Sequence, residues 1–421
     1  MENLVRTARK DSDFDLFCRR FQMTETLLSF PPEAMKTLHL AEFYEDFWKL
    51  AGESRRITKF ADEEKNISQQ ILSQVRQENN PVRRQYLALA LILFGEFQES
   101  LRLTDQNLWT SQLRDDFIIF FRWQQVLNNP LTPQRRAAFV RSEQITDFLQ
   151  EKYSALTKKH SQDLINDKTC PRVKKYQIYY CWLQGEESLP PIVRCCYNSL
   201  KKNAGRYKII FIDEKNFSKY VDIAPHIMDK FRAGKISPAH FSDVIRINLL
   251  EKYGGLWLDS TILVTEPLEN HKNLLEKPFF TQRFNKEKNY RDNFSHHVTY
   301  GRWAGFIQGT SVIHNPLFTF EKEFYNEYWR EYDEVIDYLL MDFMMILAYE
   351  NIPAVKKEID DIPINNTNVH NLFPRLHDSY SNFPFDKIFA DTFLYKLTYK
   401  ANLDWTRVGT ILNEIKRRYG N

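Results

Sequence analysis

The sequence predicts an α/β fold, in which a mostly parallel sheet flanked by helices is preceded by an all-α N-terminal region. Three observations lead to this prediction. Residues 1 to about 165 carry helical patterns throughout, strand-like and helix-like segments alternate from Tyr176 onward, and a polar run at 158–163 separates the two parts. We therefore expect a helical region at residues 1–170 and an α/β domain at residues 171–421.

The N-terminal region is expected to form packed helices. The apolar run Tyr86–Phe94, followed by Gly95, predicts a buried helix that ends in a tight turn. A second, aromatic-rich helix is expected at Phe117–Trp123. Pro81 and Pro133 lie where helices are expected to begin, because proline suits the first helical position.

The α/β domain opens with a strand, a helix and a second strand. Ile178–Leu183 is rich in β-branched and aromatic residues, and Pro190 and Pro191 precede a helix expected to run to about Leu200. Tyr207–Asp213 has a continuous apolar centre, which is typical of a strand covered on both faces. This order predicts two parallel strands joined by a right-handed crossover.

The next helix has clear signals at both ends. Ser237 is a good N-cap, Pro238 suits the first helical position, and the glycines at 254 and 255 follow the last apolar residues. The segment at 256–264 then predicts a third strand. The remaining expected elements are helices at 317–328 and 332–349 and a loop at 351–371.

Composition and charge exclude several classes of protein. With 43% apolar and 27% charged residues, the chain is typical of a globular protein. Its net charge of +3 argues against nucleic-acid binding. No apolar run has the length of a signal peptide or a membrane span, so we expect a cytoplasmic location. The five cysteines lack metal-ligand spacing and are expected to be reduced and mostly buried.

Asp259 is the first candidate for chemistry. A carboxylate inside an apolar strand is costly unless it is paired or binds a metal ion. Because strand side chains alternate, Asp259 and Thr261 are expected to share one face, where their oxygens would suit Mg²⁺ or Mn²⁺. The alternative is that Asp259 merely ends a strand and caps the next turn, and composition alone leaves both open.

Asp243 and Arg246 are the second candidate, because residues three apart share a helical face. On most helices such a pair is a surface ion pair of little energetic value. This helix is apolar at most other positions, so a buried pair is expected. An aspartate can accept hydrogen bonds from ribose hydroxyls, and an arginine can offset the negative charge of a diphosphate.

Together these residues resemble a known family. Ser242-Asp243-x-x-Arg246 and the run Tyr253–Thr261 resemble glycosyltransferase family 32, and most of all its bacterial capsular polysaccharide synthesis proteins. The resemblance covers roughly residues 175–400, and residues 237–262 are its most specific part. It implies a GT-A fold of the Asp-x-Asp type, a nucleotide-sugar donor (a UDP-sugar in particular) and transfer with retention at the anomeric carbon.

The resemblance also implies roles for individual residues. Trp182 would stack on or flank the nucleotide base, with Gln184 and Gly185 nearby. Asp243 would bind the ribose or the donor sugar, and Arg246 the donor sugar or the diphosphate. The full expected donor-binding set is Trp182, Gln184, Gly185, Asp243, Arg246, Trp257, Asp259 and Thr261.

A divalent cation, Mn²⁺ or Mg²⁺, is the expected cofactor. Asp259 would be the first acidic residue of the Asp-x-Asp motif and would contact ribose and metal. The second acidic position is Thr261, which is a neutral and weaker ligand than a carboxylate. The expected metal ligands are therefore Asp259, Asn366 and His370, although a histidine in such a loop is more often an ordinary surface residue.

The expected catalytic residues are Asp259, Arg246 and Asp342. No dedicated nucleophile is evident, so the acceptor hydroxyl is expected to attack from the leaving-group side. Asp337 or Asp342 would position acceptor or donor hydroxyls. The alternative is that both are helix-surface or capping residues.

The resemblance favours a capsular polysaccharide precursor, a glycan or lipid-linked glycan, as acceptor. Two other functions stay open. Glucosylating toxins share this fold and motif, so the acceptor could be a protein, and the change to Thr261 would suit a nucleotide-sugar-binding scaffold without catalysis. A dehydrogenase is disfavoured, because no Gly-x-Gly-x-x-Gly follows the first strand. The helical region is expected to bind a partner or to present the catalytic domain to the inner face of the membrane.

Overall fold

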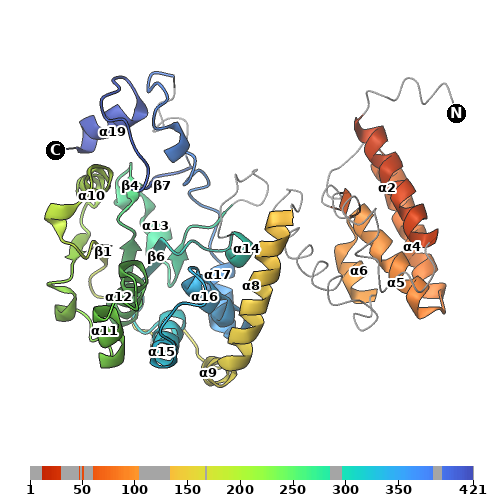
Figure 1. Cartoon of the computed structure of the whole chain (residues 1–421), viewed down its shortest axis with the longest axis horizontal. Coiled ribbons are helices and arrows are strands. Elements are labelled where there is room, and N and C mark those ends of the chain that lie inside the picture. Colours follow the sequence, from red (N-terminus) through yellow and green to blue (C-terminus); the bar gives the residue numbers. More distant parts are fainter. Residues whose placement is uncertain are drawn as a thin grey trace. The chain divides into compact units, whose positions relative to one another are not determined.

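The computed structural model describes residues 12–29, 47, 50–51, 60–103, 133–165, 168–284, 296–382 and 391–420 (Figure 1). Its contacts divide the chain into two units. The first comprises Met1–Glu143 and Lys286–Tyr300, and the second Gln144–Asn285 and Gly301–Asn421. The expected helix at Phe117–Trp123 lies outside the described residues.

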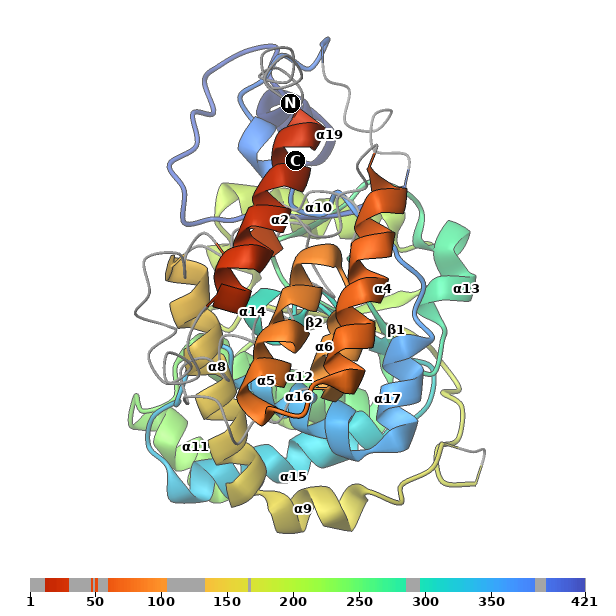
Figure 2. The same ribbon diagram turned by 90° about the vertical axis from the view of Figure 1, so that its right-hand side faces the viewer.

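The first unit is helical where it is described. Its helices are α2 (Ser12–Ser29), α4 (Ala61–Gln77), α5 (Pro81–Ala90), the 3₁₀ helix η3 (Leu91–Phe94), α6 (Phe97–Leu103), the start of α8 (Pro133–Lys152) and α14 (His296–Thr299). Figure 2 shows α2, α4, α5 and α6 together, and α5 contacts each of the other three. The buried helix expected at Tyr86–Phe94 is confirmed, because residues 86–93 of α5 and η3 are buried and Gly95 follows with φ of +82°.

The second unit contains a five-stranded sheet in the order β2-β1-β3-β6-β5. The strands are β1 (Gln177–Cys181), β2 (Lys208–Ile212), β3 (Gly255–Leu258), β5 (Phe280–Thr281) and β6 (Ile307–Thr310). Strands β2, β1 and β3 are parallel, as expected, whereas β6 is antiparallel to both of its neighbours. The sheet is therefore mixed. The expectation of a mostly parallel sheet holds for β2, β1 and β3 but not for the pairings that β6 makes.

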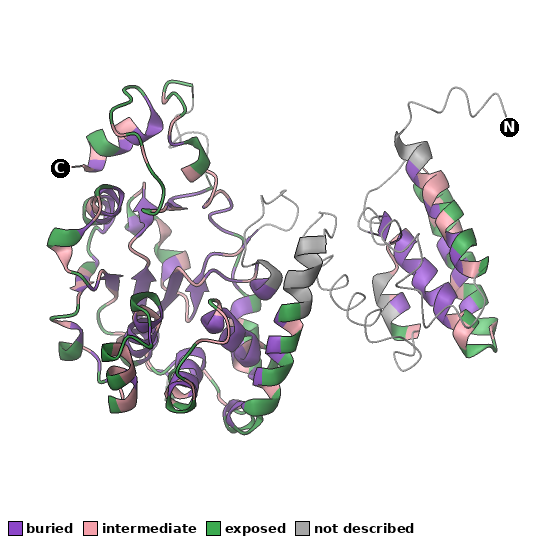
Figure 3. Cartoon of the chain, in the orientation of Figure 1, coloured by how far each residue is buried: buried purple, intermediate pink, exposed green. Residues whose placement is uncertain are grey.

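Helices cover both faces of this sheet. Figure 1 shows the strands between α10 on one side and α12 and α15 on the other, and Figure 3 shows the buried residues concentrated along the strands. The helices of this unit, besides the end of α8, are α9 (Ser154–His160), α10 (Pro191–Asn203), α11 (Pro225–Arg232), α12 (Pro238–Tyr253), α13 (Lys272–Leu275), α15 (Pro316–Glu331), α16 (Leu340–Asn351), α17 (Pro353–Asp360) and α19 (Ile411–Tyr419). Short 3₁₀ turns connect them at 186–188, 217–219, 268–271 and 373–375.

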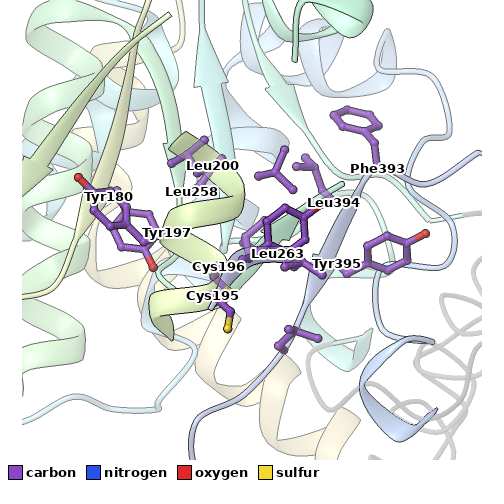
Figure 4. Packing of buried hydrophobic residues seen from close by; sticks show 14 of the residues in the cluster. Tyr180, Cys195, Cys196, Tyr197, Leu200, Leu258, Leu263, Phe393, Leu394 and Tyr395 are labelled. Carbon is purple, nitrogen blue, oxygen red and sulfur yellow. The ribbon is translucent and has the colours of Figure 1, made fainter. Parts of the chain in front are cut away.

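A second, two-stranded sheet lies beside α10. Strand β4 (Ile262–Val264) pairs antiparallel with β7 (Leu394–Lys396), which is distant in sequence. Their side chains join one large buried cluster with α10 and α19, and Figure 4 shows Leu263 and Leu394 packed within it. This pairing brings the C-terminal part of the chain to the segment that follows β3.

The helix expected between Ser237 and Gly254 is confirmed as α12. The Ser237 hydroxyl accepts a hydrogen bond from the backbone N–H of His240 at 3.3 Å, which makes it the N-cap. Gly254 and Gly255 have φ of +62° and +101°, a region that side chains other than glycine rarely adopt. They let the chain turn from α12 directly into β3.

Four expectations are corrected. The strand expected at 256–264 is broken at 259–261, where the backbone N–H of Ile262 donates to the carbonyl of Asp259 at 2.9 Å. The second strand lies at the edge of its sheet and alternates in burial, so it is not covered on both faces. The helix expected at 332–349 begins only at Leu340, after a turn in which Asp337 accepts from the N–H of Leu339. The expected loop at 351–371 contains α17.

Two other expectations can be compared with the structure. None of the five cysteines forms a disulfide bond and four are buried, as expected. Among the described residues, no helix combines the length and the apolar character that crossing a membrane requires.

Gly255→Ala is expected to destabilise the second unit strongly. A Cβ atom at this position would lie 2.4 Å from the carbonyl oxygen of Gln177 in β1, and φ is +101°. We expect the free energy of unfolding to fall by about 3 kcal/mol, measured by urea denaturation. Gly234→Ala is the control, because φ is +75° there but no atom lies within 4 Å, so strain alone should cost about 1 kcal/mol. Equal losses would contradict the assigned backbone contact.

Candidate functional site

The candidate site lies at the edge of the sheet where β1 and β3 end. Because these strands are parallel neighbours, Trp182 after β1 and Asp259 after β3 emerge at the same edge. The hydroxyl of Tyr180 donates to the carbonyl of Ser260 at 2.7 Å and fastens the two strand ends together. The chain runs from β1 to β2 on one side and returns through α12 to β3 on the other. Ligands collect at such a reversal in α/β sheets.

A turn at 259–261 presents Asp259 to this edge. The backbone N–H of Asp259 donates to the carbonyl of Phe306 at 3.0 Å, and its carbonyl accepts from Ile262 at 2.9 Å. Thr261 is buried at 7% exposure, and its carbonyl accepts from the N–H of Leu397 at 2.9 Å. The premise that Asp259 and Thr261 alternate along one strand is therefore wrong, because the strand ends at Leu258.

Arg246 of α12 lies at the centre of the site. Its side chain is 4% exposed, pairs with Asp243 at 2.7 Å and approaches Asp259 at 3.5 Å. The guanidinium also donates to the carbonyl of Gly305, and its carbon lies 5.0 Å from the centre of the Trp257 ring. The buried Asp243–Arg246 pair expected from the sequence is confirmed.

The Asp259 carboxylate is held by three groups. Its Oδ1 accepts from Trp257 Nε1 at 3.0 Å and approaches Arg246, and its Oδ2 accepts from Lys396 Nζ at 2.7 Å. Burial raises the pKa of Asp259, but the charges of Lys396 and Arg246 outweigh it and hold this pKa below the ordinary value. Asp259 is therefore an anion at neutral pH.

Two more carboxyl groups lie behind Arg246. Glu321 of α15 is fully buried, and neither of its carboxyl oxygens has a hydrogen-bond partner among the described residues. Burial raises the pKa of Glu321 well above its ordinary value, against the lowering effect of Arg246. Asp342 of α16 accepts from Trp303 Nε1 at 3.0 Å. Burial thus favours the neutral form of Glu321.

Aromatic side chains border the site on its open side. Trp182 is partly buried, donates through Nε1 to Ser188 at 3.0 Å, and meets the Tyr399 ring edge-on at 5.3 Å between centroids. Tyr338 is 65% exposed and Tyr399 is 45% exposed. The Asp259 charge contributes to raising the pKa of Tyr338, after burial and Asp243, which places this ring near both carboxylates. Sugars and bases commonly stack on such exposed rings.

The remaining expected donor-binding residues differ in exposure. Gln184 is exposed, and Gly185 has φ of +93° with open space on the side where a Cβ atom would lie. Trp257 is 2% exposed, so its ring faces the protein interior and reaches the site through its hydrogen bond to Asp259. The structure thus brings Trp182, Asp243, Arg246 and Asp259 to one edge and leaves Trp257 and Thr261 behind it.

The residues expected to bind a metal ion make other contacts in the structure. Asn366 is fully buried, and its side-chain oxygen accepts from the backbone N–H groups of Phe393 and Leu394, both at 3.0 Å. His370 lies between aromatic rings, 5.4 Å from Phe306 between centroids. Both oxygens of Asp259 bind protein groups, as described above. Among the described residues, no three His, Cys, Asp or Glu side chains are grouped as metal ligands. This arrangement does not fit a divalent cation.

A cavity of 430 Å³ with polar and apolar lining residues lies apart from these residues. Elements α11, α12 and α15 line it, with Asp222, Asn248, Glu251, Lys322 and Asn326 among its polar residues. It follows a different face of α12 from the one that carries Arg246, since Val244, Asn248 and Glu251 are spaced along one helical stripe.

Sequence reasoning missed Lys396, Glu321 and the two exposed tyrosines. Lys396 lies 137 positions from Asp259 in the chain, so no local spacing signals their contact. Glu321 shares a helical face of α15 with Leu317, Phe324 and Tyr328, and a carboxylate on an apolar face is a signal that could have marked it. Tyr338 and Tyr399 lie in turns, where exposed aromatic residues carry no periodic pattern.

Comparison with known proteins identifies the family. No curated protein and no solved structure matches the chain significantly. A family model described as capsular polysaccharide synthesis protein matches residues 122–415. The match spans well over half of the chain, begins earlier than the resemblance at 175–400, and contains α12, the 259–261 turn and β7. The chain therefore belongs to the capsular polysaccharide synthesis protein family.

Proposed function

We propose that the chain is a retaining glycosyltransferase that moves a sugar from a nucleotide sugar, a UDP-sugar in particular, to a capsular polysaccharide precursor. The observation that carries this proposal is the cluster of Asp243, Arg246 and Asp259 at the carboxyl edge of β1 and β3, beside Trp182. Membership of the capsular polysaccharide synthesis family supports the same acceptor class.

The donor is proposed to lie across the ends of β1 and β3. Trp182 directly follows the carboxyl end of β1, and its ring offers an aromatic surface to the base. Asp259 is anionic and 28% exposed, so its carboxylate can accept a hydroxyl hydrogen bond from ribose or sugar. Asp243, with 17% of its side chain exposed, offers a second acceptor one helical turn from Arg246.

The chemical step is proposed to need charge stabilisation rather than a protein nucleophile. The bond between the anomeric carbon and the diphosphate oxygen breaks, and the acceptor oxygen forms its bond from the same side. The proton of the acceptor hydroxyl passes to the departing phosphate oxygen. Arg246 lies at the site with a positive charge that Asp243 and Asp259 stabilise against the effect of burial, so it can stabilise the negative charge that develops on the leaving group.

Asp342 is proposed to position Arg246 from behind. It is 6% exposed, and a Cβ atom at Gly305 would lie 3.8 Å from both Asp342 Oδ1 and Arg246 Nη1, so the two side chains flank the same glycine. Burial raises the pKa of Asp342 to about 7, partly offset by the hydrogen bond from Trp303. The proposed role of Asp342 is therefore exerted through Arg246 and not by contact with the donor.

Asp259→Asn is expected to reduce transfer at least about 100-fold, since about 2.7 kcal/mol of stabilisation separates a charged from a neutral partner in such sites. The assay measures nucleoside diphosphate release from a panel of nucleotide sugars, with a capsular oligosaccharide as acceptor. Asp333→Asn is the matched control, because Asp333 is an ion-paired carboxylate of the same unit with half of its side chain exposed. Equal activity of Asp259→Asn and wild type would contradict the proposed site.

Trp182→Ala is expected to weaken nucleotide binding about tenfold, because base stacking on an aromatic ring contributes on the order of 1–3 kcal/mol. Trp182→Phe should retain most of the affinity, since it keeps a ring at the strand end. Calorimetric titration with uridine diphosphate measures both. If the alanine variant binds as tightly as the phenylalanine variant, the base does not lie on Trp182.

Asp342→Asn is expected to flatten the dependence of stability on pH. The pKa of Asp342 is about 7 in the folded protein, against about 3.9 in an unfolded chain. The unfolded state therefore releases this proton first, and the stabilisation present below about pH 4 is lost as the pH rises to about 7. Urea denaturation at several pH values should show a shallower loss for Asp342→Asn than for wild type. Asp333→Asn, which removes a carboxyl group whose pKa is lowered by Lys235, should not flatten it.

A further inference from the structure

Lys396 occupies a defined place beside the candidate site. It is the last residue of β7 and pairs in register with Ile262 of β4, directly after the 259–261 turn. Its ammonium group lies 2.7 Å from Asp259 Oδ2 and 5.0 Å from the centre of the Phe306 ring. The side chains of Lys396 and Asp259 are 24% and 28% exposed, so a ligand at the sheet edge can reach both.

The backbone around Lys396 is held by the residues that were expected to bind a metal ion. The Asn366 side-chain oxygen accepts from the N–H groups at the start of β7, and the carbonyl of Thr261 accepts from Leu397 immediately after Lys396. The N–H of Lys396 itself donates to the carbonyl of Val369 at 2.8 Å. Thr261 and Asn366 thus hold in place the strand that carries Lys396. Their oxygens are used for this purpose and not as ligands of a metal ion.

A divalent ion and Lys396 compete for the same carboxylate. An ion bound to Asp259 Oδ2 would lie close to the ammonium group, and two like charges at that separation repel strongly. Asp259 Oδ1 already accepts from Trp257 and faces Arg246. The two cations, Lys396 and Arg246, therefore flank Asp259 on both of its oxygens.

We propose that the Lys396 ammonium takes the place of a divalent cation at this site and binds the diphosphate of the donor, while the buried Arg246 adds positive charge beside Asp259. Among the described residues, Asp259 is the one hydrogen-bond acceptor of this ammonium, which leaves two of its three N–H groups for phosphate oxygens. Asp259 also holds the lysine in place, in addition to its proposed contact with a donor hydroxyl. The inference rests on the proposed function, since it assigns the donor's diphosphate to this edge.

The inference predicts that nucleoside diphosphate binding does not depend on metal. We would titrate the full chain with uridine, guanosine, adenosine and cytidine diphosphates by calorimetry, in Mn²⁺ and in EDTA. For the nucleotide that binds, wild type should have the same affinity in both buffers, within about twofold. Lys396→Ala should weaken binding at least about tenfold in EDTA, and Lys396→Arg should retain it, because each charge-assisted hydrogen bond to phosphate contributes substantially.

Lys230→Ala is the matched control. Lys230 lies in the same unit, has 16% of its side chain exposed and pairs with Asp333 at 2.9 Å, but it lies on α11. It should leave binding unchanged, and thermal melting should show that each variant is folded.

Three results would overturn the inference. Wild-type binding that is lost in EDTA, or binding that Lys396→Ala leaves unchanged, would overturn it while leaving the proposed function in place. No binding of any nucleoside diphosphate in either buffer would overturn the proposed function and this inference together.

Discussion

A guanidinium removed from water needs acceptors on several sides, and the burial of Arg246 is the constraint on which the rest of the site depends. Its partners come from three parts of the second unit: Asp243 from its own helix, Asp259 from the turn after β3, and the carbonyl of Gly305 before β6. Trp257 covers the guanidinium and holds Asp259 at the same time. The site therefore depends on α12 packing against the sheet in one position.

The carboxyl groups around Arg246 divide into two electrostatic classes. Asp259 is held as an anion by Lys396 and Arg246, whereas burial favours the neutral form of Glu321, which has no hydrogen-bond partner among the described residues. Whether a carboxyl group in this cluster is charged depends on how close it lies to a cation and how far it is exposed to solvent, and not on whether it belongs to Asp or Glu. As a result the charge of Asp259 lies on the open side of the cluster, where the proposed donor would bind, whereas burial favours the neutral form of Glu321 behind Arg246.

Much of the second unit could be predicted from local signals. The capping serine, the helix-starting prolines and the paired glycines marked α12, and the apolar runs marked β1 and β2. The same reasoning failed where a tertiary partner decides the conformation. The polar residues at 259–261 left open whether the strand continues or ends at Asp259, because the turn is stabilised by Phe306 and Leu397 from distant segments. The expected metal ligands failed to form a set for the same reason, since Asn366 is used by the start of β7.

The sequence by itself determined which residue types are available, the family, and the elements whose ends are capped by their own neighbours. Asp243, Arg246 and Asp259 were found in this way, because helical spacing pairs the first two and Asp259 follows the apolar run of β3 at the carboxyl edge of the sheet. Only the tertiary structure decided what surrounds Asp259. The pairing of β4 with β7 joins residues at least 130 positions apart, and it brings Lys396 to a carboxylate that sequence reasoning had assigned to a metal ion. Contacts between distant segments depend on how the layers pack, and local patterns do not encode them.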